Sequence, residues 1–148
     1  MIIPDYDGKS INNITPTIAS HFGTRVSPIN KDLKKALKNK KNIILLVLDG
    51  FGYYYFINNR KNLNMFNKAL KIERITAVFP PTTAASLTSF TTGRPPGVHG
   101  MLSFYCFIKE FGMITNLLKF TPKYDRIKGE IKNLAGFVKE KSIFSKIK

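Results

Sequence analysis

The feature that most constrains the fold of this chain is an uninterrupted apolar run, Ile43-Ile44-Leu45-Leu46-Val47-Leu48, followed directly by Asp49-Gly50-Phe51-Gly52. The run does not alternate between apolar and polar residues, which is typical of a central parallel strand covered on both faces. It is too short for a buried helix and far short of the roughly 20 residues that a membrane-spanning helix needs. We therefore expect a strand here, with the carboxylate of Asp49 at its carboxyl end.

The segments that follow predict an α/β fold. Residues 53–58 and 62–70 are typical of a short aromatic segment and a helix, and the β-branched residues at 72–78 indicate the next strand. Strand, helix and strand in this order imply a right-handed βαβ unit in a parallel sheet. A further helix is expected at 83–92, with Leu87 and Phe90 on its apolar face.

The chain on either side is predicted to be less regular. Residues 1–30 contain several proline, glycine and asparagine residues, so we expect an irregular lead-in around one short helix at 11–22. We further expect a helix that opens at 30–33, a loop and a short strand within 101–120, an amphipathic helix at 124–139 and a helical turn from 142.

The composition is that of a single globular domain. With 148 residues, 43% of them hydrophobic, the chain can bury roughly two-thirds of its unfolded surface. Cys106 is the single cysteine, so no internal disulfide holds the fold. The first residues lack a cationic start followed by an apolar stretch of signal-peptide length, so we expect a cytoplasmic protein with no membrane partner.

The charge is strongly positive, because 24 lysine and arginine residues face nine acidic ones to give a net charge of +15. Such a charge favours anionic partners, and its densest cluster lies at 31–41. Two explanations remain open: a nucleic-acid-binding surface, or a lysine-rich bias of the whole proteome. The chain contains no recognisable nucleic-acid-binding motif, so nucleic acid is the less favoured partner.

Two places carry residues suited to chemistry. Asp49 lies where ligands bind in open α/β sheets, and it can hold a ligand or cap the next helix. Thr82 and Thr83 follow two prolines, and a helix starting near Ala84 would direct its N–H groups at a phosphate. A threonine hydroxyl attacks phosphorus only when a base or a metal ion lowers its pKa, and the nearby sequence has no His or Lys base. A helix cap is the alternative role for these threonines as well.

A longer phrase decides between these roles. Residues 79–101 read Phe-Pro-Pro-Thr-Thr-Ala-Ala-Ser-Leu-Thr-Ser-Phe-Thr-Thr-Gly-Arg-Pro-Pro-Gly-Val-His-Gly-Met. This phrase resembles the nucleophile region of the type I phosphodiesterase and nucleotide pyrophosphatase family, within the alkaline phosphatase superfamily. In that family an Asp-Gly after the first core strand binds metal, and a threonine nine residues before a Thr-Gly pair is the nucleophile.

The resemblance assigns roles to three residues. Thr92-Gly93 matches the Thr-Gly pair, so Thr83 is implied as the catalytic nucleophile and as a metal contact, with Asp49 as a metal ligand. Many pyrophosphatases of the family carry Asn where Ser86 stands, so Ser86 is implied as a shorter hydrogen-bond donor to the substrate phosphate. The implied cofactors are two divalent ions, Zn or Mn, and the implied substrate is a nucleotide or another phosphoester.

The same resemblance implies a parallel-sheet, alkaline-phosphatase-like core that is incomplete. The family places further Asp and His ligands well beyond the nucleophile, whereas no histidine follows His99 in this chain. His99 itself matches the family's structural turn, and His21 is expected to be a helix-terminal or packing residue. We therefore expect residues 1–148 to be the N-terminal part of such a domain, with 1–30 as its lead-in, whose activity would need a C-terminal portion or an oligomer.

Three other hypotheses stay open on the sequence. The first is a cofactor-independent phosphomutase of the same superfamily, although the Thr-Thr-Ala and Thr-Gly-Arg-Pro-Pro phrases fit the phosphodiesterase branch better. The second is a basic, non-catalytic nucleic-acid-binding module. The third is an inactive, poorly folded fragment that has lost the neighbours of its sheet.

Overall fold

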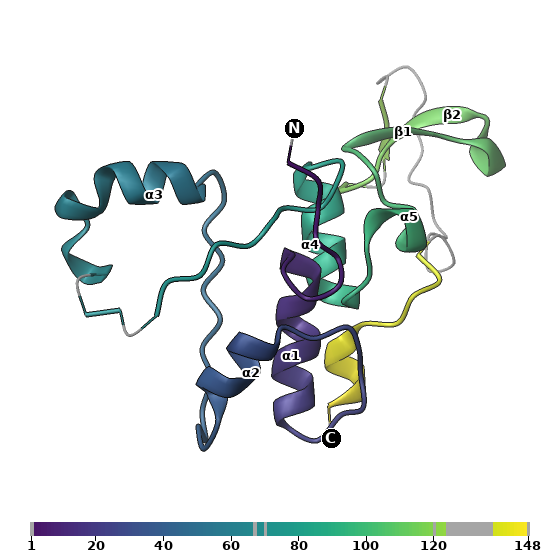
Figure 1. The fold of residues 1–148 in the computed structure, drawn as a ribbon. Coiled ribbons are helices and arrows are strands. Elements are labelled where there is room, and N and C mark those ends of the chain that lie inside the picture. Colours follow the sequence, from purple (N-terminus) through teal and green to yellow (C-terminus); the bar gives the residue numbers. More distant parts are fainter. Residues whose placement is uncertain (1, 67, 70, 120, 124–137, 148) are drawn as a thin grey trace.

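The computed structural model describes residues 2–66, 68–69, 71–119, 121–123 and 138–147 (Figure 1). The α-helices are α1 (Ile14–His21), α2 (Lys31–Leu37), α3 (Tyr53–Asn59), α4 (Thr83–Thr92) and α5 (Pro96–His99). The strands are β1 (Tyr105–Ile108), β2 (Met113–Asn116) and β3 (Thr121–Pro122). Single turns of 3₁₀-helix are η1 (Ile11–Asn13), η2 (Arg60–Asn62), η3 (Asn64–Phe66), η4 (Lys109–Phe111) and η5 (Ile143–Lys146).

Helix α4 lies at the centre of the molecule and contacts η1, α1, α5 and η5 (Figure 1). Small residues allow this close approach, since Ala84, Ala85 and Ala19 are fully buried. The helix ends at Gly93, whose φ of 69° is left-handed and therefore favours glycine. A Cβ at Gly93 would also lie 2.6 Å from Cγ of Pro16 in α1, so this glycine allows the two helices to meet.

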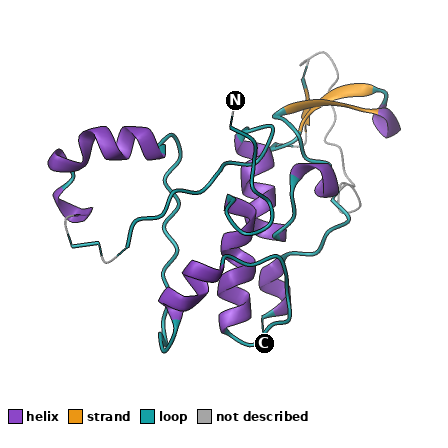
Figure 2. Cartoon of the chain, viewed as in Figure 1, coloured by secondary structure: helices purple, strands orange, loops and turns teal. Residues whose placement is uncertain are grey.

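The described residues form a small antiparallel sheet in the order β1-β2-β3. The β1–β2 hairpin pairs Tyr105 with Asn116 and Ile108 with Met113. Its buried side chains, Ile108 together with Leu117, form a cluster with Ala84 of α4. Figure 2 shows that helices make up most of the regular structure and that the sheet lies at one end.

Polar side chains hold the N-terminal region together. Oδ1 of Asn13 accepts a hydrogen bond from the Ser10 N–H at 2.9 Å, and its Nδ2 donates to the Tyr6 carbonyl at 2.9 Å. The neighbouring Asn12 is fully buried, and neither its Oδ1 nor its Nδ2 has a hydrogen-bond partner among the described residues. The two asparagines therefore contribute to stability in opposite directions.

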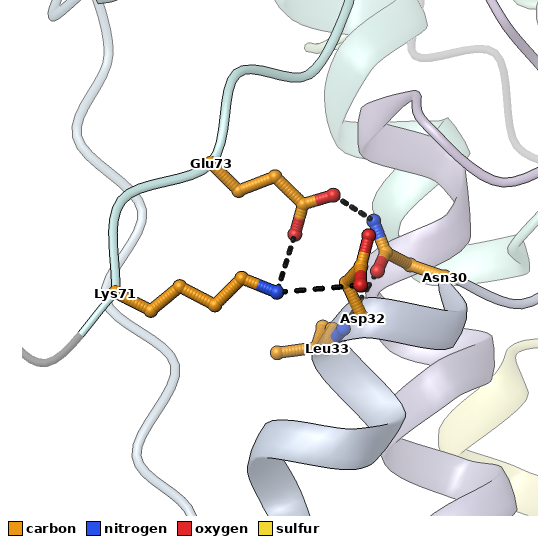
Figure 3. Close-up of polar contacts among 5 residues, drawn as sticks. All are labelled: Asn30, Asp32, Leu33, Lys71 and Glu73. Carbon is orange, nitrogen blue, oxygen red and sulfur yellow. Dashed lines mark hydrogen bonds and ion pairs between the residues drawn. The ribbon is translucent and has the colours of Figure 1, made fainter.

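The start of α2 is fixed by a polar cluster (Figure 3). Asn30 caps the helix, because its Oδ1 accepts from the Leu33 N–H at 2.7 Å. Its Nδ2 donates to Glu73 at 3.3 Å, and Lys71 lies 3.5 Å from Asp32 and 3.9 Å from Glu73. These contacts join α2 to the segment that returns from α3.

The parallel sheet expected at the centre is not found in the described residues. Residues 43–48, predicted as a central strand, are an extended and unpaired coil in which Ile44 is 95% exposed. Of the predicted strand at 72–78, only Thr76 forms a single parallel bridge, with Ser10. The physical reason is that a strand exists only where a neighbour satisfies its N–H and C=O groups, and none of the described segments lies along residues 43–48.

Most of the other predicted elements are present, but the helix predicted at 62–70 is not found in the described residues, where η2 and η3 are single 3₁₀ turns. The helix predicted at 11–22 is η1 followed by α1, and those predicted at 30–33 and 83–92 are α2 and α4. The strand expected within 101–120 is a hairpin of two strands, and η5 is the turn expected from 142. Most of the amphipathic helix predicted at 124–139 lies outside the described residues. Among the helices that are described, none has the length and apolar character needed to cross a membrane.

Candidate functional site

The start of α4 is set by Thr82, which is the N-cap of the helix. Its Oγ1 accepts a hydrogen bond from the Ala85 N–H at 3.3 Å and donates to the Leu102 carbonyl at 2.9 Å. The Ser86 N–H then donates to the Thr82 carbonyl at 2.8 Å, which closes the first turn. Thr82 therefore caps α4, which is a role that the sequence allowed. Its hydroxyl is used both as an acceptor and as a donor.

Thr83, the first residue of α4, is in a different situation. Its side chain is half-buried and, among the described residues, its hydroxyl has no hydrogen-bond partner. The backbone N–H groups of Thr83 and Ala84 likewise have no acceptor within the described part of the chain. Ser86 lies three residues further on and so on the same face of the helix, where its half-buried hydroxyl is also unpaired among those residues.

His99, at the end of α5, supports this end of α4 through hydrogen bonds. This side chain is only 3% exposed. Its Nδ1 accepts a hydrogen bond from the Met101 N–H at 3.1 Å, so the proton of the neutral ring is on Nε2, which lies 2.9 Å from Oγ of Ser89. Desolvation by burial lowers the pKa of His99 below its ordinary value, while the Ala85 carbonyl and the charge of Glu140 act in the opposite direction.

Two of these hydrogen bonds, together with the backbone between Met101 and Leu102, connect His99 to Thr82. His99 holds the N–H of Met101, and the carbonyl of the next residue, Leu102, accepts from Thr82. The ring also holds Ser89 in the middle of α4. The sequence predicted His99 as part of a structural turn, and the Ser89 and Leu102 contacts were not predicted because neither residue carries a motif of its own.

The structure does not bring Asp49 to the start of α4. Asp49 is exposed, and its Oδ1 accepts from the N–H of its neighbour Gly50 at 2.9 Å. It belongs to the coil between α2 and α3, which lies on the α3 side of the molecule and apart from α4 in Figure 1. Among the predicted site residues, Thr83 and Ser86 therefore share one helix end, while Asp49 lies on a separate segment.

Comparison with known proteins bears on this arrangement. Residues 43–131 match the family described as type I phosphodiesterase / nucleotide pyrophosphatase. The chain belongs to that family. The matched range contains both the Asp49 segment and the whole of α4, and it follows the phosphodiesterase branch that the sequence favoured over the phosphomutases. No curated protein and no solved structure matches the chain.

The resemblance to this family implies metal ions, which several side chains would have to hold together. A two-metal site holds its ions roughly 3.5–4 Å apart with several ligands each. The described residues contain no group of three or more His, Cys, Asp or Glu side chains that could hold one ion. Asp49 supplies one carboxylate at a distance from the threonine end, so the described residues do not by themselves fit the family's metal centre.

Proposed function

We propose that this protein is a phosphodiester or pyrophosphate hydrolase whose nucleophile is the hydroxyl of Thr83. The observation that carries the proposal is the contrast between two adjacent threonines. The Thr82 hydroxyl is engaged as donor and as acceptor, whereas the Thr83 hydroxyl is unpaired among the described residues. A nucleophilic hydroxyl must be free to turn toward phosphorus, so Thr83 suits the role and Thr82 does not.

The chemistry follows from what surrounds that hydroxyl. Oγ1 of Thr83 attacks the phosphorus atom, the bond to the leaving group breaks, and water later releases the phosphate from the threonine. The unpaired N–H groups at the start of α4 and the Ser86 hydroxyl bind the non-bridging oxygens. The positive end of the helix dipole favours the negative charge that these oxygens carry.

We assign the activation of the Thr83 hydroxyl to groups outside the described residues. The family resemblance places Asp49 among the ligands of a metal site, but this carboxylate is exposed and alone. We propose that the remaining ligands come from a further C-terminal portion or from another copy of the chain. The substrate class is a nucleotide or another small phosphoester.

Hydrolysis of bis-p-nitrophenyl phosphate by the purified chain, with added Zn²⁺ or Mn²⁺, tests this proposal. Thr83→Ala is expected to reduce turnover by at least about 100-fold, because removing a covalent nucleophile leaves only the contribution of binding. Thr91→Ala is the matched control. It removes the same atoms from an exposed residue of the same helix, whose hydroxyl bonds only the Leu87 carbonyl, and it should leave turnover within about twofold.

Three outcomes are informative. Equal turnover in the wild-type chain and in Thr83→Ala would refute Thr83 as the nucleophile. Loss of turnover in both variants would show that α4 is merely sensitive to substitution. A wild-type chain that turns over no substrate with either metal would contradict the proposal that another copy of the chain supplies the remaining ligands.

A further inference from the structure

A cavity lined by basic side chains lies at the other end of α4 from Thr83. The cavity, of about 760 Å³, opens beside the C-terminal ends of α1 and α4, the loop after α1, and η5. Its rim includes Thr92 and Gly93, the last residue and the cap of α4. A helix of this length puts about 15 Å between that rim and Thr83, so the cavity is separate from the proposed active site.

Four basic side chains line this cavity, and each comes from a different part of the chain: Arg25 from the loop after α1, Lys34 from α2, Arg94 from the segment after α4 and Lys146 from η5. Among the residues that the structure describes, none of those lining the cavity is acidic. The fold therefore gathers like charges that the sequence keeps far apart, and these charges repel one another unless an anion lies between them.

The acids of the described chain neutralise only one member of this group. Asp32 and Glu73 each pair with Lys71 near the start of α2 (Figure 3). Glu140 pairs with Arg94 at 3.6 Å. Within the described ranges, Arg25, Lys34 and Lys146 have no acidic partner at all. At least three positive charges are therefore available to a ligand.

The polar groups of the cavity indicate what kind of ligand it takes. Ser20, Thr24 and Ser27 are among the lining residues. Nζ of Lys34 donates to Oγ of Ser20 at 3.2 Å, and the Thr24 hydroxyl donates to the Lys146 carbonyl at 3.3 Å. The carbonyl ends of α1 and α4 oppose an anion, but each amounts to only about half a negative charge. Three or four unit positive charges outweigh them, so the net potential of the cavity is positive and favours a ligand with several negative charges over one with a single charge.

We propose that this cavity binds a small polyanion with two or more linked phosphate groups. Its volume lies within the roughly 300–1,000 Å³ of small-molecule sites, and its hydroxyl and cationic groups are those that bind phosphate oxygens. The site does not depend on the proposed hydrolase activity, since none of its lining residues is Thr83, Ser86 or Asp49.

Titration of the full chain with inorganic pyrophosphate, in EDTA and without metal, tests the proposal by calorimetry and by amide NMR shifts. The double variant Lys34→Gln/Lys146→Gln is expected to bind at least tenfold more weakly than the wild-type chain. The control Lys9→Gln/Lys119→Gln removes the same charge from exposed lysines that do not line the cavity, and it should bind within about twofold of wild type. Thr83→Ala should bind like wild type, which separates this test from that of the active site.

Several results would overturn the proposal. Equal weakening in the two double variants would reveal a general attraction to positive charge, as would amide shifts spread over the whole surface. No binding of pyrophosphate by the wild-type chain would exclude the ligand class. Tighter binding of a single-stranded oligonucleotide, lost in the same Lys34→Gln/Lys146→Gln variant, would assign the cavity to nucleic acid instead.

Discussion

At the scale of single residues, the start of α4 shows how neighbours of the same type acquire different roles. Thr82 and Thr83 are chemically identical, yet only Thr82 meets a carbonyl, that of Leu102, which lies 20 residues further along the chain. The cap that Thr82 makes is a local property, typical of threonine before a helix. The second hydrogen bond of Thr82 depends on where the segment between α5 and β1 lies, and the sequence alone could not predict it.

His99 gives the molecule a pH dependence at this scale. Burial favours its neutral form in the folded chain, while in the unfolded chain it titrates near its ordinary pKa of about 6.5. Its contribution to stability is therefore complete above that value and is lost as the pH falls toward the lowered pKa of the folded state. Protonation of Nδ1 would also break the hydrogen bond from the Met101 N–H.

We expect the urea midpoint of the wild-type chain to fall between about pH 8 and about pH 5.5, and to fall less in His99→Gln, which cannot titrate. His21→Gln offers the control, because it replaces the other histidine, whose Nε2 lies 2.7 Å from the Lys40 carbonyl and whose ring lies against Phe22. It leaves His99 in place, so the part of the slope that comes from His99 should remain. A His99→Gln chain with the full wild-type slope, or a His21→Gln chain that loses it, would contradict this assignment.

At the scale of elements, helices were predictable and the central strands were not. The boundaries of α4 follow from a threonine cap and a glycine stop, and both signals are local. The run at 43–48 has the residues of a buried strand, but its pairing depends on partners elsewhere. The hairpin β1–β2 does form, because Gly112, with a φ of 61°, turns the chain so that its two strands meet.

The element η1 offers a matched test of buried polar groups. Asn12→Leu removes an amide that has no partner among the described residues, so it should leave the free energy of unfolding unchanged or raise it by about 1–2 kcal/mol. Asn13→Leu removes an amide bonded to Ser10 and Tyr6 and should lower that free energy by about 1–3 kcal/mol. Urea denaturation of both variants measures the difference, and equal losses would show that Asn12 is satisfied in solution.

At the scale of the whole molecule, the most consequential feature is apolar surface left uncovered along 43–48. Ile44 is 95% exposed and Leu46 is 66% exposed, and their backbone has the unpaired groups of an open strand. Exposed segments of high β-propensity without charge or proline are sites of self-association. The tendency to self-associate is therefore a property of the whole molecule and not of any single helix or strand.

We therefore expect the wild-type chain to associate as its concentration rises, and Ile44→Lys/Leu46→Lys to remain monomeric in sedimentation or light scattering. Stability should stay within about 0.5 kcal/mol, because exposed side chains contribute little to it. Asn58→Lys/Asn62→Lys adds the same charge at exposed polar positions and should associate like wild type. A large loss of stability in the Ile44 and Leu46 variant would mean that this segment is buried in solution.

The features that the sequence by itself determined are either local structure or a recognisable motif. The extent of α4, the cap at Thr82 and the stop at Gly93 follow from short-range patterns, because each depends on residues within one or two turns of each other. The family follows from motifs within residues 43–131. The roles of Thr83, Asp49 and Ser86 remain predictions of the resemblance. Only the tertiary structure decided that residues 43–48 lie unpaired, that His99 joins Ser89 to the loop behind Thr82, and that Arg25, Lys34 and Lys146 face one cavity. Those outcomes depend on which distant segments meet, and long-range contacts leave no signature in the order of neighbouring residues.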